Sequence, residues 1–449
     1  MIPEIVTILD GIPYQHRFPA PDEVSERLDA VAGRHPSLVR RRRVGTSRQG
    51  KPIDLVSIGS GPRDALVFAG PHPNEPVGFL TVPYLAELLC ADDGLRERLG
   101  YTWHLMGCVD PDGAQLNEGW YAGPLTRRHY ARQHYRPPFN EQVEWAFPLP
   151  GGSDAVLPET RALMHVIDTV RPELMCSLHN AEFGGVYYYL SNERPRIADA
   201  LAELSARTGI PLHVGDAELP GTRPIRPGVF VIPSLESAHQ AMTEEADGSM
   251  GASSVHYAGR HGTFSLIIEV PIWTNPHSAD NTTSDQRRAE VLTATAGMLQ
   301  EISPRIGEAI DPALETMTTA GSFFARSLAD LRRNAPALAA ALRHQARHAG
   351  DAVATVAERF AARQTAHTLR LRACGIALRL LDEQASCNNR TATLQDARRA
   401  LDDLFTAWAD EADAEAASTP VPLHRLLGAQ LGAILTAAAL HNEAASISR

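Results

Sequence analysis

The chain lacks a paired-cysteine motif and any apolar run approaching the length of a membrane span. Its five cysteines are scattered without a C-x-x-C pair, so the sequence indicates neither a disulfide framework nor a thiolate zinc site. A bilayer crossing needs roughly 20 consecutive apolar residues, and we see no run of that length. These absences favour a globular protein without a membrane partner.

Positive charge is also scarce. The sequence has 42 Lys and Arg residues against 53 Asp and Glu residues, a formal net charge of -11, and Lys51 is its only lysine. Such a balance argues against nonspecific nucleic-acid binding. The opening stretch, MIPEIVTILDGIPYQHRF, lacks the basic start, apolar core and cleavage site of a secretory signal, so we expect a cytoplasmic location.

Residues 1–303 alternate apolar strand-like runs with amphipathic helical stretches. This pattern predicts one domain, an α/β fold with a mixed, mostly parallel central sheet flanked by helices. Residues 79–91 and 158–170 have helical spacing of their apolar residues. The expected strands are short, apolar and rich in β-branched residues. They are 52–59, 64–70, 102–110, 173–179, 186–191 and 264–271.

Residues 304–449 predict a second domain of a different kind. They are rich in Ala, Leu, Arg and Glu with little glycine, which favours an all-α bundle of about four helices. We expect breaks near Pro336, at 386–393 and at 418–422. This accessory domain could pack against the first, pair subunits into a homo-oligomer, or close over a site as a lid.

The stretch GPHPNEPVG (70–78) holds a histidine and a glutamate in a stiff turn. His72 and Glu75 directly follow an apolar strand, at the carboxyl end where open α/β sheets build their sites. His179 ends another apolar strand in the same way. A catalytic zinc commonly takes three protein ligands, so these residues predict one Zn²⁺ per chain bound by His72, Glu75 and His179.

A glutamate inside an apolar strand is the other conspicuous feature. Glu269 lies in FSLIIEVPIW, where burial of an ionised carboxylate is costly unless it is paired or near a metal. Beside a zinc site it could act as the general base; the alternative is an edge-strand glutamate that faces solvent.

Together these motifs resemble the carboxypeptidase A-like zinc metallopeptidases over roughly residues 15–300. The ligand loop, DPDGAQLN (110–117), LPETRAL (157–163), RPELMCSLHN (171–180) and HGTFSLIIEV (261–270) follow in the family's order. The resemblance implies that His72, Glu75 and His179 bind zinc and that Glu269 is the general base and acid. It further implies that Arg127, in PLTRRHY (124–130), stabilises the developing oxyanion, and that Arg128 beside it, with Asn140 and Glu141, is a substrate-binding residue.

The sequence departs from this family where the substrate would bind. The family's Asn-Arg pair, which binds a free carboxylate, is replaced by Asn140 and Glu141, and the tyrosine expected about twenty residues before the catalytic glutamate is missing from 244–254. Arg132, Arg136, Arg223 or Arg226 could restore carboxylate binding from another direction.

We therefore expect a zinc-dependent hydrolase acting on a small peptide or an amino-acid conjugate. A deacylase or amidase on the same scaffold is a close variant, and a catalytically weak binding or assembly protein that keeps zinc is the alternative from another class.

Overall fold

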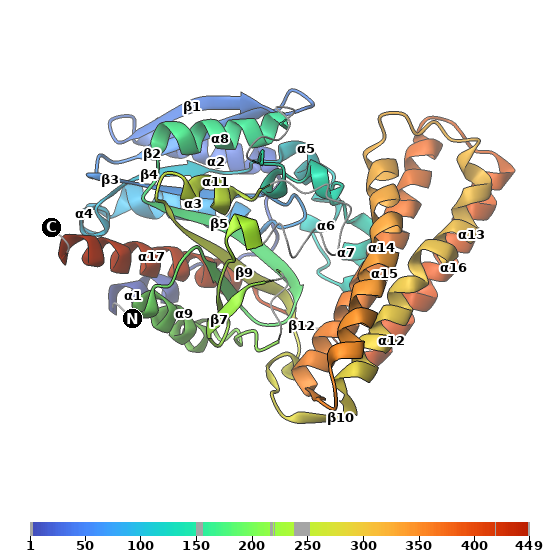
Figure 1. Ribbon diagram of the computed structural model, residues 1–449. Coiled ribbons are helices and arrows are strands. Elements are labelled where there is room, and N and C mark those ends of the chain that lie inside the picture. The colour runs from blue at the N-terminus through green and yellow to red at the C-terminus, as the bar shows by residue number, and fades with distance from the viewer. Residues whose placement is uncertain are drawn as a thin grey trace.

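The structure, a computed structural model, describes residues 3–149, 156–215, 219, 221–237, 252–417 and 419–447. It consists of an α/β body and a bundle of long helices that projects from one side of that body (Figure 1).

The body is built on a mixed ten-stranded sheet. Its path runs β1-β2-β4-β3-β5-β9-β6-β8-β7, and β12 adds to β9. The four central strands β4, β3, β5 and β9 are mutually parallel, whereas the pairs toward both edges are mostly antiparallel. The strands are β1 (Val39–Thr46), β2 (Pro52–Ile58), β3 (Arg63–Ala69), β4 (Tyr101–Met106), β5 (Leu174–Phe183), β6 (Tyr187–Leu190), β7 (Arg223–Arg226), β8 (Val229–Val231), β9 (Phe264–Thr274) and β12 (Thr419–Pro420). All six predicted strands are confirmed, as is the α/β fold class.

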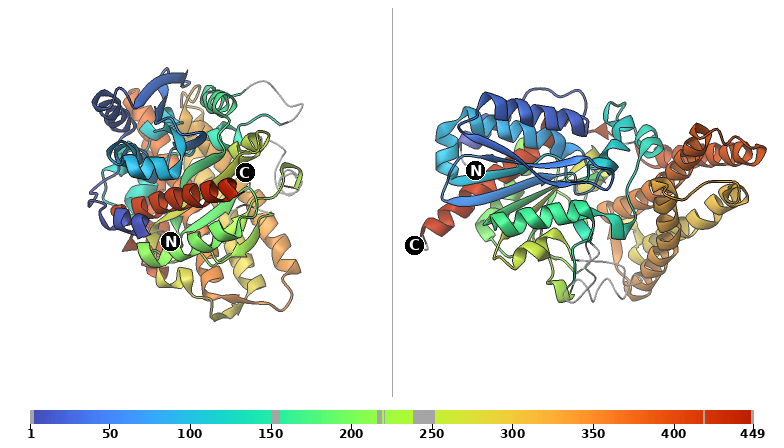
Figure 2. Two further views of the ribbon diagram at one scale, coloured as in Figure 1. Left: turned by 90° about the vertical axis from the view of Figure 1, so that its left-hand side faces the viewer. Right: turned by 90° about the horizontal axis from the view of Figure 1, so that it is seen from above.

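Helices cover both faces of this sheet because successive side chains of a strand point to opposite faces. In β3, Val67 and Ala69 enter one apolar core, while Leu66 and Phe68 enter the other. In the right-hand view of Figure 2, α2 and α3 lie on one side of the strands and α8 on the other. The first face is covered by α1 (Pro3–Asp10), α2 (Pro21–Arg34), α3 (Val77–Ala91), α9 (Pro195–Thr208) and α17 (Leu423–Ile447), and the second by α8 (Pro158–Val170) and α11 (Ser254–Gly259).

Short elements make up the rest of the body. After α4 (Asp93–Leu99) and β4, the chain forms α5 (Pro111–Gln115), α6 (Glu118–Tyr121), α7 (Arg127–Gln133) and two 3₁₀ turns, η1 (Phe139–Glu141) and η2 (Val143–Trp145). A third turn, η3 (Pro276–Ala279), follows β9 and leads toward the bundle.

The bundle contains four helical arms. Its first arm is formed by α12 (Arg288–Gln300) and α13 (Ile302–Leu314), and the others are α14 (Phe323–His348), α15 (Val356–Ser386) and α16 (Ala392–Glu415). These helices pack on one another, and α15 also packs on α7 and η3 of the body. At its base, β10 (Thr283–Arg287) pairs with β11 (Val353–Thr355).

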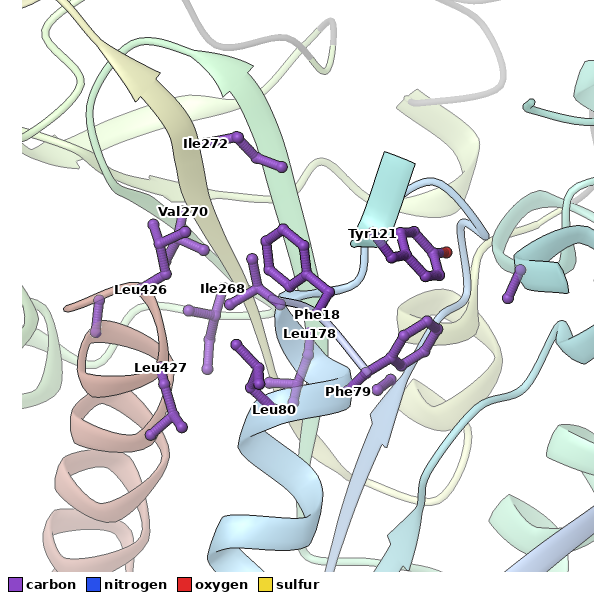
Figure 3. Packing of buried hydrophobic residues seen from close by; sticks show 14 of the residues in the cluster. Phe18, Phe79, Leu80, Tyr121, Leu178, Ile268, Val270, Ile272, Leu426 and Leu427 are labelled. Atoms are coloured by element: carbon purple, nitrogen blue, oxygen red, sulfur yellow. The ribbon is translucent and has the colours of Figure 1, made fainter. Parts of the chain in front are cut away.

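The division of the chain differs from the expected boundary at residues 303 and 304. Helix α12 already belongs to the bundle, and the chain returns to the body through β12 and α17. Figure 3 shows Leu426 and Leu427 of α17 beside Ile268 and Val270 of β9. The apolar surface of α17 is therefore used to complete the body's core, so the helical domain is an insertion within the α/β fold.

The expected helix break near Pro336 is wrong, because α14 continues through that residue. A proline inside a helix removes one backbone hydrogen bond, and packing of α14 against α12 and α15 offsets this loss. The interruptions at 386–393 and 418–422 coincide with the actual ends of helices.

Helix α17 also bears on the membrane question. Among the described residues, it is the helix whose length and composition would suit a bilayer crossing, with a mean hydropathy of 1.3. However, 78% of that apolar window is buried inside the protein. Its hydrophobicity is explained by its contacts with α3, α9 and β9.

Candidate metal centre

The loop between β3 and α3 holds the first two candidate ligands at the carboxyl end of a central strand. Pro76 is the N-cap residue of α3, and the backbone N–H of Glu75 donates to the carbonyl of His72 at 3.1 Å. At Gly78 an added Cβ would lie 2.6 Å from the Cβ of Ala69. A glycine is needed there so that α3 can approach the sheet and hold the loop against it.

The structure brings His72, Glu75 and His179 together. They offer ligand atoms that all lie within 4.8 Å of one another, and each residue is only 3–4% exposed. Nδ1 of His179 lies 2.9 Å from Oε2 of Glu75, and the two imidazole rings have centroids 5.0 Å apart. This convergence comes from β3 and β5 being parallel neighbours, which places the ends of both strands at the same edge of the sheet.

His179 and Glu75 are held in their orientations by three neighbouring residues. The Oγ atom of Ser177 lies 2.7 Å from its Nε2, which leaves Nδ1 facing Glu75. The side-chain amide of Gln430, on α17, donates to its backbone carbonyl at 2.8 Å. The N–H of Asn180 donates to Oε2 of Glu75 at 3.3 Å. Partners of this kind fix the direction in which a metal ligand points.

Electrostatics keep both types of ligand in the state that binds a metal. Burial, followed by the charges of Arg136, His179 and Arg372, holds the pKa of His72 well below its usual range, so its imidazole is neutral. For Glu75, burial raises the pKa, but the hydrogen bond with His179 and the charge of Arg136 outweigh burial and lower it, so the carboxylate stays ionised.

These residues fit a zinc ion. The buried Nδ1 of His72 has no hydrogen-bond partner among the described residues, as expected for an atom reserved for a metal. Two imidazoles and a carboxylate form a donor set that zinc prefers, with room in its coordination for water or substrate.

Glu269 lies beside the ligands. Strands β5 and β9 are parallel and pair His179 with Glu269, which places the Oε1 atom of Glu269 3.8 Å from Nδ1 of His179. Its side chain is 12% exposed. Register explains why a glutamate stands inside an apolar strand: it is directed to the edge where the ligands meet.

Arg127 is placed elsewhere. One of its guanidinium nitrogens donates to Oε1 of Gln364 on α15 at 2.6 Å, and the group lies 4.6 Å from the centre of the Phe183 ring. Gln364 also lines a cavity of about 320 Å³ between the bundle helices. The described contacts of Arg127 are thus with the bundle and the end of β5, and none of them is with a zinc ligand.

The expected substrate-binding residues also face the bundle or solvent. Arg128 pairs with Asp410 and Asp413 of α16 at 2.5 and 2.9 Å. Glu141 pairs with Arg48 at 2.9 Å and with Arg326 of α14 at 2.8 Å, while Asn140 is exposed. No described contact connects these three residues to the ligands, so their substrate-binding role stays a prediction. Most of the stretch 244–254, with its missing tyrosine, lies outside the described residues.

Of the four arginines considered as replacements, Arg136 reaches the site. Its Nη1 donates to Oε1 of Glu75 at 2.9 Å. The other three make ion pairs away from the ligands: Arg132 with Asp382, Arg223 with Glu193, and Arg226 with Asp199.

Sequence reasoning missed two charged residues near the site. Glu144 is 1% exposed, and Ser254 holds one of its oxygens through two hydrogen bonds, at 3.2 and 2.7 Å. Burial raises its pKa, and the charges of His179 and Glu75 also act on it. The second is Arg372, whose charge acts on His72. Neither lies in a motif, and their neighbours in the sequence gave no signal.

A buried His-Glu-His set with a carboxylate beside it, at the strand ends of an α/β sheet, defines a metallopeptidase site. The zinc carboxypeptidase family model matches residues 24–214. Over these residues the chain belongs to the zinc carboxypeptidase family, and the structure brings the predicted ligands His72, Glu75 and His179 together as an HxxE and histidine set that fits a zinc ion.

Solved structures with detectable similarity include a protein from Shewanella denitrificans that is described as a metallopeptidase. It shares 15% identity, with 56% of this chain and 81% of that chain covered and a TM-score of 0.40. Carboxypeptidase A from Helicoverpa armigera shares 16% identity over 57% of this chain and 66% of that chain, with a TM-score of 0.39. A metallo-carboxypeptidase from Burkholderia cenocepacia shares 17% identity over 57% of this chain and 60% of that chain, with a TM-score of 0.36.

Proposed function

We propose that the protein is a zinc-dependent amide hydrolase that cleaves a peptide or an amino-acid conjugate. The observation that carries this proposal is the position of Glu269, 3.8 Å from a histidine of a buried three-residue ligand set. Zinc bound by His72, Glu75 and His179 supplies a Lewis acid that polarises the scissile carbonyl and makes water more acidic.

Glu269 has the chemistry of the general base. A carboxylate in this position accepts a proton from the attacking water and then donates it to the leaving nitrogen, so that the amine departs neutral. Glu75 is unsuited to this role, because the hydrogen bond with His179 and the charge of Arg136 lower its pKa and weaken it as a base.

The test is turnover by the purified protein, with and without zinc, on three substrate sets: free peptides, C-terminally amidated peptides and N-acyl amino acids. We expect zinc-dependent products by mass spectrometry. Products from the N-acyl amino acids alone would identify a deacylase on this scaffold, and products from no set would contradict the proposal.

The Glu269→Gln variant separates catalysis from metal binding. We expect it to keep one zinc per chain, measured by elemental analysis, while kcat falls by roughly 10² to 10⁴, the usual contribution of a general base. The exposed Glu97 offers a matched control, since Glu97→Gln makes the same chemical change away from the site. Full activity in Glu269→Gln would rule out the assigned role.

A further inference from the structure

One face of α15 docks directly against the body near the zinc site. Arg372, Gly375 and Arg379 have the three- and four-residue spacing that places side chains on one helical face. Arg379 donates to the carbonyl oxygens of Leu116 and Gln133 at 2.7 and 2.6 Å. A Cβ at Gly375 would lie only 1.9 Å from the carbonyl oxygen of Ala131, so the glycine lets the two backbones touch.

This close approach inserts Arg372 beside the ligand loop. Its side chain is 12% exposed, forms an ion pair with Glu182 of β5, and donates to the hydroxyl of Tyr130 at 3.0 Å. That hydroxyl also accepts from Nδ2 of Asn74 at 3.5 Å, and Asn74 lies between His72 and Glu75 in the chain. Arg372 is thus one hydrogen-bonded residue away from the loop that carries two zinc ligands.

Arg372 retains hydrogen-bonding capacity. Its Nε is buried without a hydrogen-bond partner among the described residues. An unpaired buried donor is costly, and a guanidinium donor is matched best by a carboxylate. Burial lowers the pKa of this guanidinium, so its charge is poorly solvated, and the nearby Tyr130 and Glu75 offset only part of that cost.

The guanidinium of Arg136 also lies beside the zinc ligands. Arg136 contacts Glu75, and its charge acts on both His72 and Arg372. The site therefore combines one cation from the body with another from the bundle, whereas the residues at the positions of the family's Asn-Arg pair, Asn140 and Glu141, have no described contact with the ligands.

We propose that Arg372, together with Arg136, binds a carboxylate group of the substrate, so that the inserted bundle carries part of the specificity. This inference rests on the proposed hydrolase function. The guanidinium of Arg372, whose buried Nε has no described hydrogen-bond partner, provides the donor for the incoming carboxylate, and Glu182 balances its charge when no substrate is bound.

The test compares two peptides that differ only in a C-terminal carboxylate or carboxamide. The readout is the ratio of kcat/KM for the free acid to kcat/KM for the amide. We expect wild-type protein to prefer the free acid, Arg372→Gln to lower the ratio at least tenfold, and Arg372→Lys to restore part of it. Glu182→Gln should raise the ratio, because it removes a carboxylate that competes for Arg372.

Opposite shifts in these two variants distinguish recognition from simple loss of structure. Arg379→Gln is the control, since it loses docking hydrogen bonds on the same face of α15 and should leave the ratio unchanged. Equal ratios in wild type and Arg372→Gln, or shifts in the same direction for Arg372→Gln and Glu182→Gln, would overturn the assignment. Equal cleavage of both peptides by wild type would overturn it while leaving the hydrolase function intact, whereas cleavage of neither would overturn both.

Discussion

The α/β body and the inserted bundle use polar side chains in different ways. In the body, polar groups near the zinc site are almost fully enclosed; Asp110 and Asn74 are both 0% exposed. Along the bundle's contact with the body, several charged pairs are open to solvent, as with Arg128 and Asp410, at 40% and 66% exposed. The contrast indicates that burial in the body holds the side chains of the zinc site in place. The interface between the bundle and the body has a few close contacts among charged pairs that remain exposed to solvent.

Two of the predicted substrate-binding residues contact the bundle instead of the zinc ligands. Arg128 and Glu141 contact α16 and α14, which lie outside the segment that matches the family. Residues at these positions dock the insertion, and the insertion in return brings Arg372 to the site. Under the proposed role of Arg372, the helical domain would thus supply a substrate contact in place of the residues that dock it.

The largest expected effect concerns a buried group of the body. Burial raises the pKa of Asp110 to about 7, and its Oδ2 has no partner among the described residues. Because the folded-state pKa is raised, the protonated acid is favoured by folding; this stability is present below about pH 4 and is lost as pH rises through about 7.

Asp110→Asn should therefore remove the loss of folding stability that the ionisation of Asp110 causes at high pH. An asparagine is neutral at every pH and its Oδ1 can still accept from the N–H of Gly113. At pH 8 we expect the variant to gain up to roughly 4 kcal/mol in unfolding free energy relative to wild type, and little at pH 4. Denaturant melts at both values test this, and a gain that is the same at both would contradict a raised pKa.

The next effect tests the close contact between the two regions. Gly375→Ala would place a methyl group against the carbonyl of Ala131, so we expect destabilisation of about 1–3 kcal/mol, as for overpacking elsewhere, and lower kcat/KM as Arg372 moves. Gly297→Ala in α12 is the matched control. Its Cβ would meet nothing within 4 Å, so helix propensity alone should stabilise by about 1 kcal/mol. Thermal unfolding of both variants is the measurement. Stabilisation by both substitutions would contradict a close contact between Gly375 and the carbonyl of Ala131.

The smallest effect is expected for an exposed pair across the interface. Arg128→Ala removes the ion pairs with Asp410 and Asp413, and because these groups are 40–66% exposed we expect a loss of only about 0.2–1 kcal/mol, which should shrink in high salt. A salt-insensitive loss of several kcal/mol, measured by denaturant unfolding, would show that this interface is as tightly enclosed as the body.

The sequence predicted features that depend on nearby residues. Strands such as β3 and β5 have local apolar patterns, and two ligands follow one strand while the third ends another, so their meeting followed from parallel pairing. Arg372 could not be found in this way. It lies nearly 200 residues from His179, and only the docking of α15 on α7 brings it to the site.

The position of α17 was missed for a similar reason. Its composition resembles that of the bundle helices that precede it, and a helical period alone does not say which sheet or helix an apolar face will cover. Gln430 is the residue that indicates where α17 packs. It is a fully buried amide in an apolar helix, and its partners are the carbonyl of His179 and the hydroxyl of Thr81, both in the body.

The antiparallel pairing of β12 with β9 has a consequence for folding. Thr419 pairs with Thr274, so the whole bundle is a loop whose two ends are neighbours in the sheet. Closing so long a loop as flexible chain costs conformational entropy, but helices form through local contacts and can shorten the flexible span before closure. A bundle that forms first then holds β12 beside β9 and so positions the start of α17. Unfolding of the bundle should release α17 from the body, so we expect the two regions to unfold cooperatively.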